Sequence, residues 1–218
     1  MTEINLMERY PQTKRNLSER SQEKTEEDRV IAGKFGKEYF DGDRKYGYGG
    51  YSYHPRFFSE VVEDMVRHYG LSEGSKILDV GCAKGFMLHD FKRLHPEIIV
   101  RGIDISEYSI ENSKPEVREF LSVGNARDLS EFGDDEFNLV ISINTIHNLP
   151  LEECKQALKE IQRVGKNSFI TVDAWRDDAG KEDMNTWNLT AKTFMQVDDW
   201  KNLFDGVGYT GDYYWFIP

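Results

Sequence analysis

Asp79, Gly81, Ala83 and Gly85 place one acid and three small residues at alternate positions of a short segment. Glycine and alanine leave the backbone open to a ligand, because almost no side chain stands in the way. The segment leads into a predicted helix, whose first backbone amides have no partner within the helix. Such a turn suits a ligand that carries a carboxylate or a phosphate. The segment therefore indicates a cofactor-binding turn, unless it is an ordinary connection between a strand and a helix.

The elements on either side of this turn narrow the choice of cofactor. Residues 76–80 are typical of a strand in a covered parallel sheet, and apolar residues recur at helical spacing from Phe86 onward. A dinucleotide turn, Gly-x-Gly-x-x-Gly, would need glycines where this chain has Ala83 and Phe86. The phenylalanine would obstruct both a pyrophosphate and the packing of the helix. The residues thus disfavour a dinucleotide.

Asp104 ends a second predicted strand, Ile98–Asp104, and follows Gly85 by 19 residues (104 − 85). A carboxylate at this place can accept hydrogen bonds from both hydroxyls of a ribose. The alternative is that Asp104 caps the helix predicted to start at Ser106. We favour the contact with ribose, given the turn upstream.

Polar residues also follow the next two predicted strands. Asn125 and Ala126 come after the third strand, predicted at Glu116–Leu121, and Asn144 comes after the fourth, predicted at Phe137–Ile143. Ligands of open parallel sheets lie outside the carboxyl ends of the strands. We therefore expect these residues to gather with the turn at one edge of the sheet.

Four segments in this order resemble the class I S-adenosylmethionine-dependent methyltransferases, of the type that acts on small molecules. The turn is similar to their first motif, Asp/Glu-x-Gly-x-Gly-x-Gly, with Ala83 in place of the central glycine. Gly124–Ala126 resembles a segment that often reads Gly-Asp-Ala, and Ser142–Pro150 looks like the segment after the fourth strand. Arg163–Gly165 looks like the end of the following helix. The resemblance extends from about residue 58 to residue 172.

The resemblance implies that the chain binds S-adenosylmethionine and releases S-adenosylhomocysteine. The turn would surround the methionine part, the acid after the second strand would hold the ribose, and the neighbouring residues would hold the adenine. The cofactor residues implied in this way are Asp79, Gly81, Cys82, Ala83, Gly85, Asp104, Ile105, Asn125, Ala126 and Asn144.

Methyl transfer from a sulfonium is an in-line displacement, so positioning and exclusion of water can supply much of the catalysis. An amine acceptor only has to be neutral, whereas a hydroxyl usually needs a general base or a metal. His147, after the fourth strand, is our candidate base, with a structural role as the alternative. His54 is a second candidate. We expect no metal, because Asn144 stands where the family's metal-dependent members use an aspartate.

Aromatic residues with polar tips suit an acceptor that contains a ring, such as a sugar, a phenol or a nucleobase. Several such side chains are expected near the strand ends, in a glycine- and tyrosine-rich stretch and in the C-terminal third of the chain. The substrate residues expected are Tyr46, Tyr48, Tyr53, Trp175 and Trp187.

Alternating strand and helix patterns predict an α/β fold, a doubly wound and mostly parallel Rossmann-like sheet with helices on both faces. Further helices are expected at 58–69, 151–164 and 197–204, and further strands at 168–172 and 208–216. The family sheet normally ends in an antiparallel hairpin, for which this chain has little room. The terminal strand is either absent or supplied by residues 190–196.

The chain divides into three predicted segments. Residues 1–30 are highly charged and should form an arm that is mobile or packs little, with a homodimer through this arm as an option. Residues 31–54, rich in glycine and tyrosine, should form a lid loop carrying aromatic contacts rather than a linker. Residues 55–218 should form the S-adenosylmethionine-binding domain.

The composition excludes several classes of protein. With 28 basic and 39 acidic residues, a net charge of -11 disfavours a nucleic-acid substrate. No segment resembles a signal peptide or a membrane span, so we expect a cytoplasmic protein. Of two cysteines, Cys154 should be in the core.

Methyl transfer to a small molecule, such as a sugar, a nucleotide-linked sugar or another biosynthetic intermediate, is the predicted function. The alternatives are a protein or RNA methyltransferase and a non-catalytic regulatory module.

Overall fold

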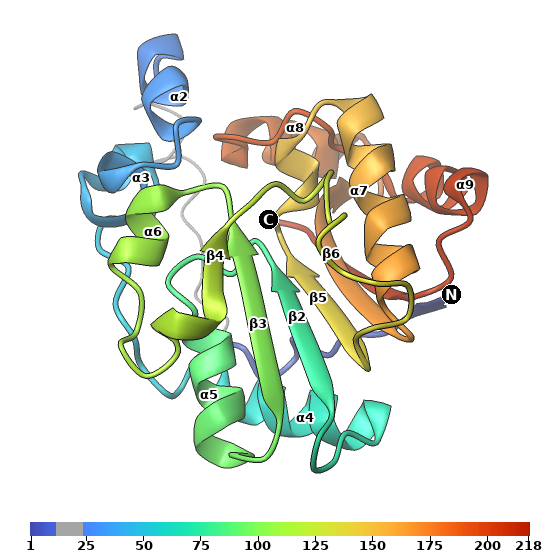
Figure 1. The fold of residues 1–218 in the computed structure, drawn as a ribbon. Coiled ribbons are helices and arrows are strands. Elements are labelled where there is room, and N and C mark those ends of the chain that lie inside the picture. The colour runs from blue at the N-terminus through green and yellow to red at the C-terminus, as the bar shows by residue number, and fades with distance from the viewer. Residues whose placement is uncertain (12–23) are drawn as a thin grey trace.

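The computed structural model describes residues 1–11 and 24–218. Its centre is an eight-stranded sheet with the order β1-β8-β6-β5-β2-β3-β4, and β7 pairs with β6 outside this path (Figure 1). The pairings between the described strands are parallel, which confirms the predicted doubly wound, mostly parallel sheet. The strands are β1 Thr2–Glu3, β2 Lys76–Val80, β3 Ile99–Asp104, β4 Leu121–Val123, β5 Leu139–Ile143, β6 Ser168–Trp175, β7 Met195–Gln196 and β8 Asp212–Phe216.

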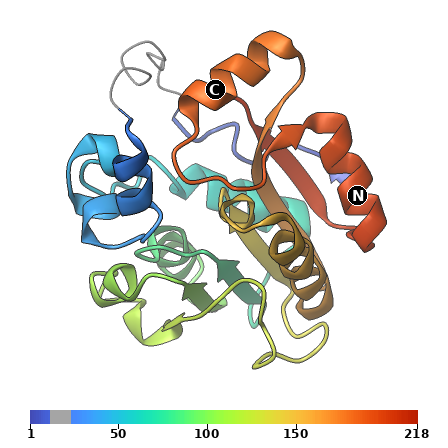
Figure 2. The same cartoon turned by 90° about the horizontal axis from the view of Figure 1, so that it is seen from above.

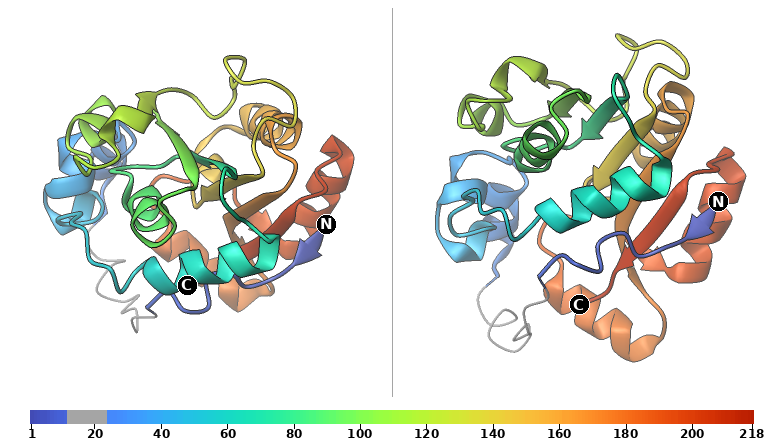
Figure 3. Two further views of the ribbon diagram at one scale, coloured as in Figure 1. Left: turned by 60° about the horizontal axis from the view of Figure 1, so that its bottom comes forward. Right: turned by 90° about the horizontal axis from the view of Figure 1, so that it is seen from below.

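Helices cover both faces of this sheet, because each exposes one apolar stripe that must be buried. The apolar sides of α4 and α5 pack into one core cluster, and those of α7 and α9 pack into a second one (Figure 3). The helices are α2 Glu26–Ala32, α3 Lys37–Asp41, α4 Ser59–Tyr69, α5 Phe86–Leu94, α6 Glu107–Glu111, α7 Leu151–Val164, α8 Asp178–Trp187 and α9 Val197–Val207, with short 3-10 helices η1 Arg44–Tyr46, η2 Arg118–Phe120 and η3 Ile146–Asn148. In the described part of the chain, every helix is too short or too polar to cross a bilayer.

The C-terminal strands differ from the antiparallel hairpin that the resemblance implies. β8 lies beside β6 and runs parallel to it, because α9 carries the chain back across the sheet before β8 begins. Residues 190–196 supply only the two-residue β7, which pairs with the end of β6. The outermost position beyond β8 belongs to β1. The predicted terminal strand is therefore replaced by a strand from the N-terminus.

Two elements were placed incorrectly from sequence. The third strand is at Leu121–Val123 instead of Glu116–Leu121, and residues 118–120 form a 3-10 helix. Among the described strands it pairs with β3 alone, so few ladder contacts define its ends. The helix α8 was not predicted, because Met184 is its only buried side chain and gives no apolar period. Cys154 is fully buried in the core, as expected.

The N-terminal residues contradict the expected arm. Besides the β1–β8 pairing, the N-terminal segment runs alongside α4 (Figure 3). Leu6 is only 6% exposed and packs in the cluster around α4, and the ring of Tyr10 lies 5.5 Å from that of Phe58. Scattered apolar residues in a charged segment give no periodic signal, which is why sequence reasoning missed this packing. Residues 12–23 of the predicted arm lie outside the described residues.

Leu6→Ala should lower the free energy of unfolding by about 2 kcal/mol, since the substitution leaves a cavity under α4. Urea denaturation followed by circular dichroism measures this. Val30→Ala is the matched control, because Val30 is 56% exposed and should change stability by less than about 0.5 kcal/mol. Equal stability of wild type and Leu6→Ala would contradict the packing of the N-terminal segment.

Candidate active site

The predicted cofactor turn connects β2 to α5 at the carboxyl edge of the sheet. Gly81, Ala83 and Gly85 have φ angles of +89°, +49° and +72°, in the left-handed region that suits glycine. A Cβ on Gly81 would lie 2.1 Å from Oγ1 of Thr145, which belongs to the loop after β5. Glycine is therefore required at position 81, and it lets two neighbouring strand ends approach each other closely.

Asp104 holds this turn to the end of β3. Its Oδ2 accepts a hydrogen bond from the backbone N–H of Ala83 at 2.8 Å, and its Oδ1 accepts one from the N–H of Ser106 at 2.9 Å. Ala83 is thus fixed in a left-handed conformation that costs a non-glycine residue about 1–2 kcal/mol. A carboxylate has about four lone-pair sites, so at least one remains for a ribose beside the hydrogen bonds from Ala83, Ser106 and Ser109. The structure shows the contact with the helix start, and the contact with ribose stays a prediction.

Asp79, at the end of β2, is only 5% exposed. Burial, together with the charge of Asp104, raises its pKa to about 7. Burial also raises the pKa of Asp104. Two acids in one buried site favour a ligand with positive charge, since such a ligand relieves their repulsion.

The affinity for S-adenosylmethionine should therefore depend on pH. Because the pKa of Asp79 is raised in the folded state, its carboxyl is neutral below about pH 7 and attracts the cationic cofactor less. The affinity should rise by up to ~10-fold per unit from pH 5.5 to 7.5, and Asp79→Asn should make the profile flatter. The same shift means that folding stability falls as pH rises from about 4 to 7, because the folded state binds more protons there.

Isothermal titration calorimetry at several pH values measures this dependence. Asp128→Asn is a suitable control, since Asp128 is exposed and its pKa is lowered by hydrogen bonds from Ser130. A cofactor affinity that is the same at pH 5.5 and 7.5 in the wild type would exclude Asp79 from the binding site.

The expected adenine residues follow β3 and β4. Ile105 is 53% exposed, a large fraction for an aliphatic side chain, and is free to cover a planar base. Asn125 forms a bridge with Asp128, and its Oδ1 accepts from the N–H of Arg127 at 3.2 Å. Ala126 packs on the core. The side-chain oxygen of Asn125 thus has a local partner, and Ile105 is the better placed of these residues for contact with adenine.

The loop after β5 is held against β6. Asn144 has a φ of +51°, and its backbone N–H donates to the carbonyl of Thr171 at 3.0 Å. Oγ1 of Thr171 donates to Oδ1 of Asn144 at 2.7 Å. These bonds fix the loop that carries Thr145 against Gly81. Asn144 therefore lies near the turn, as the resemblance implies.

His147 lies deeper than a base in contact with solvent would. It is 4% exposed, and its Nδ1 accepts a hydrogen bond from the backbone N–H of Asp173 at 3.0 Å. Because an N–H can only donate, Nδ1 carries no proton and Nε2 carries the hydrogen of the neutral ring. Burial lowers the pKa of His147, although the nearby carboxylate of Asp173 opposes this. In this arrangement the ring has no free lone pair for an acceptor proton.

His54, the second candidate base, is exposed. Its Nδ1 accepts from the N–H of Arg56 at 3.2 Å, and its ring lies 6.2 Å from that of Phe57. These neighbours lead into α4. The contacts of His54 therefore give it no link to the carboxyl ends of the strands.

The five expected substrate residues separate into two groups, three tyrosines in the lid and two tryptophans at the ends of β6 and α8. Tyr53 donates a 2.5 Å hydrogen bond to Asp90 of α5, and Tyr46 lies under Nζ of Lys45 at 4.7 Å. The contact of Tyr53 holds the lid to α5, and the contact of Tyr46 lies within the lid. Tyr48 is 43% exposed within a group of tyrosine rings.

The two tryptophans lie on the C-terminal part of the site. Trp175 ends β6 and contacts the ring of Phe194 at 5.9 Å, while Trp187 ends α8 and contacts the ring of Phe216 at 5.4 Å. Each tryptophan is therefore the last residue of its element, β6 or α8.

Segment 31–54 contains the end of α2, followed by α3, η1 and connecting loops, so it is more helical than the predicted loop. Seen from above, α2 and α3 lie on one side of the strand ends and α8 lies on the other (Figure 2). Nζ of Lys24 donates to the carbonyl of Thr186 at 3.0 Å, and Arg29 donates to that of Asn188 at 2.7 Å. Cations at the C-terminus of α8 complement its dipole. The two flanks are thus joined across the site.

Sequence reasoning did not select Tyr39, which lies between the two halves of the site. Its pKa is raised to about 12, chiefly by burial and also by the charges of Asp104 and Asp173, while hydrogen bonds with Tyr48 and Thr190 lower it. Tyr39 was visible as part of the tyrosine-rich segment, but no local pattern distinguished it from its neighbours. Its surroundings make it a candidate contact for the acceptor.

Among residues 1–11 and 24–218, no three His, Cys, Asp or Glu side chains are grouped to hold a metal, and the expectation of metal-free chemistry stays a prediction.

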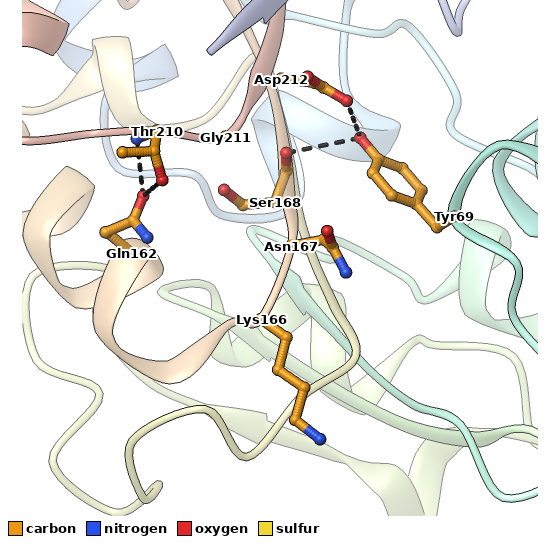
Figure 4. A pocket seen from close by; sticks show the side chains of 8 residues that line it. All are labelled: Tyr69, Gln162, Lys166, Asn167, Ser168, Thr210, Gly211 and Asp212. Carbon is orange, nitrogen blue, oxygen red and sulfur yellow. Dashed lines mark hydrogen bonds between the residues drawn. The ribbon is translucent and has the colours of Figure 1, made fainter.

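A polar cavity of about 80 Å³ lies at the start of β6 and β8, where the hydroxyl of Tyr69 donates to Asp212 at 3.1 Å (Figure 4). It opens at the amino ends of the strands, opposite the candidate site.

Comparison with known families gives a match over residues 71–208, more than half of the chain, to the family described as a methyltransferase domain. The curated proteins include no sequence that matches this chain.

Solved structures share the fold at low sequence identity. The YcgJ protein of Bacillus subtilis is 17% identical with a TM-score of 0.55, over 67% of this chain and 66% of YcgJ, slightly under two thirds of its length. An S-adenosylmethionine-dependent methyltransferase of Archaeoglobus fulgidus is 21% identical with a TM-score of 0.52, over 70% of each chain. The [4+2]-cyclase SpnF is 18% identical with a TM-score of 0.54, over 68% of this chain and 57% of SpnF. A likeness at this level shows the fold alone.

Proposed function

The chain belongs to the methyltransferase domain family, and on that premise we propose that it transfers the methyl group of S-adenosylmethionine to a small-molecule acceptor. The observation that carries the proposal is the fixed turn between β2 and α5. Asp104 holds its backbone, Gly81 leaves it open, and Asp79 adds a buried negative charge. This combination fits a ligand with a ribose and a cationic amino-acid part.

The cofactor supplies an activated methyl group when bound, so the protein mainly has to orient the acceptor and exclude water. The contacts of Lys24 and Arg29 with the end of α8 close the site from above. The aromatic residues Tyr39 and Trp175 supply walls for an acceptor that contains a ring. A site that is closed by these contacts favours a small molecule over a protein or an RNA as the acceptor.

Charge narrows the acceptor further. Asp79, Asp104 and Asp173 are each less than 10% exposed, near the carboxyl ends of β2, β3 and β6. Negative groups at this edge disfavour phosphates, so among the expected acceptors a sugar or an amine is favoured over a nucleotide-linked sugar. We keep a cytoplasmic location as a prediction. A homodimer through residues 1–30 is less favoured, because residues 1–11 pack within the chain.

Incubation of the purified protein with methyl-labelled S-adenosylmethionine and a metabolite extract tests the function. We expect label in a small, protein-free product, together with S-adenosylhomocysteine. Label only in protein or RNA would favour the alternative acceptors. Binding of S-adenosylhomocysteine without any transfer to metabolites, protein or RNA would favour a regulatory module.

With an acceptor in hand, His147→Asn should retain turnover within ~10-fold, since the Asn oxygen can accept the N–H of Asp173 as Nδ1 does. His147 has no free lone pair to accept a proton, and we propose that its role is to orient the ends of β5 and β6. Initial rates between pH 6 and 9 are the measurement. Loss of turnover with normal cofactor binding, and of the acidic limb of the pH profile, would return His147 to the role of general base.

A further inference from the structure

An ion pair between the buried Lys84 and the partly exposed Asp41 joins the cofactor turn to the lid. Lys84, between Ala83 and Gly85 in the turn, is 6% exposed, and its Nζ lies 2.9 and 2.6 Å from the two carboxylate oxygens of Asp41. The same Nζ donates to the carbonyl of Tyr51 at 2.9 Å. A buried lysine with these partners is directed at the lid and away from the cofactor side of the turn.

Asp41 organises the lid around this pair. Its Oδ1 also accepts the backbone N–H of Tyr51 at 3.0 Å, and its Oδ2 accepts the hydroxyl of Tyr108 in α6 at 2.7 Å. One carboxylate thus connects the lid, the cofactor turn and the helix that follows β3. A second contact, from Oγ of Ser106 to the carbonyl of Phe35 at 2.5 Å, holds the start of the lid to the same helix.

The aromatic rings follow the same path. The ring of Tyr51 stacks on that of Phe86, the first residue of α5, with centroids 4.8 Å apart and planes at 24°. Tyr48 lies 4.3 Å from Tyr51, and Phe40 lies 5.8 Å from Tyr51. The stack therefore places lid rings directly above the residues that begin the cofactor helix.

The ring of Tyr51, which stacks on Phe86 beside the cofactor turn, is also influenced by the two acids of the cofactor site. Burial raises its pKa well above the ordinary value, and the charges of Asp79 and Asp104 are among the further causes. The phenol therefore stays protonated at neutral pH and can donate a hydrogen bond.

We propose that the lid is the second wall of the cofactor site, with Tyr51 as a cofactor-binding residue and the Lys84–Asp41 ion pair as the contact that positions it. The ligand class is a nucleoside with an attached amino acid, and the proposal rests on the proposed function. The Tyr51 phenol suits the carboxylate of that amino acid, and the rings beside it suit a sulfonium. The lid was expected to serve the acceptor. Its contacts assign it to the cofactor as well.

Asp41→Asn tests the positioning contact. Asparagine keeps one acceptor oxygen, for the N–H of Tyr51, and its amide can donate to the hydroxyl of Tyr108, but it removes the charge that pairs with Lys84. The dissociation rate of S-adenosylhomocysteine, measured by stopped-flow fluorescence, should rise at least ~10-fold. Asp43→Asn is the matched control, since the Asp43 carboxylate accepts only a local N–H, from Lys45. In the double variant with Lys84→Met the two losses should not add.

Tyr51→Phe tests the hydroxyl and keeps the stack on Phe86. Its affinity for S-adenosylhomocysteine should fall ~5- to 10-fold, while its affinity for methylthioadenosine, which lacks the amino-acid part, should not change. Circular dichroism and thermal melting confirm folding of each variant, and Tyr51→Phe keeps the test decisive if Asp41→Asn unfolds.

The outcomes separate the two proposals. A wild-type protein that does not bind S-adenosylhomocysteine overturns the proposed function. A wild type that binds it, with unchanged release from Asp41→Asn and unchanged affinity in Tyr51→Phe, overturns the assignment of the lid to the cofactor. Equal losses for both ligands in Tyr51→Phe overturn the contact with the amino-acid part.

Discussion

Asp104→Ala should weaken the binding of S-adenosylhomocysteine by at least ~100-fold, the largest effect on affinity that we expect from a single side chain. The carboxylate has two functions that the substitution removes together. It is placed to accept hydrogen bonds from a ribose, and it holds the N–H groups of Ala83 and Ser106 at 2.8 and 2.9 Å. Loss of charge-assisted hydrogen bonds at a ligand costs about 1.5–3 kcal/mol, and relaxation of the strained turn adds to this cost.

Calorimetry with S-adenosylhomocysteine measures the change, and thermal melting shows whether the fold persists. Asp104→Asn separates the two functions, because its amide keeps one acceptor oxygen for the backbone but presents N–H groups where Ala83 or Ser106 also donates. It should bind with intermediate affinity. If Asp104→Ala binds as tightly as the wild type, Asp104 contacts no part of the cofactor.

Gly81→Ala should have the largest effect on the fold at the site. The new Cβ would meet the side chain of Thr145 at 2.1 Å and would sit on a backbone with φ of +89°. Strain of this kind and overpacking each cost about 1–3 kcal/mol, so the free energy of unfolding should fall by about 3 kcal/mol. Any movement that relieves the contact shifts the turn or the loop after β5, so cofactor binding should be lost as well.

Gly74→Ala provides a matched control for this experiment. Gly74 also has a positive φ, +77°, but a Cβ there would meet nothing within 4 Å. It should lose only about 1 kcal/mol, through backbone strain, and keep its affinity for the cofactor. Chemical denaturation and calorimetry measure both quantities. Similar losses of stability in the two variants, with binding retained in Gly81→Ala, would show that the contact with Thr145 does not restrict the turn.

The cofactor turn could be predicted because it is a local feature. Residues 76–86 contain the strand, the small residues and the start of the helix within a few positions of one another, so their pattern reports on their own structure. The buried strands β5 and β6 were predictable for the same reason. The roles of His147 and Tyr53 were not, because the partners that define them, Asp173 and Asp90, come from distant segments.

Taken alone, the amino-acid sequence determined the α/β class, the order of most elements and the kind of cofactor the chain should bind, since periodicity and small-residue spacing act over short stretches. Only the tertiary structure decided that β8 runs parallel to β6, that β1 completes the sheet, and that Lys84 reaches Asp41, 43 residues away. Such contacts depend on where long-range crossovers bring side chains together. Many segments of a chain could meet at low entropic cost, and packing of the whole core selects the ones that do.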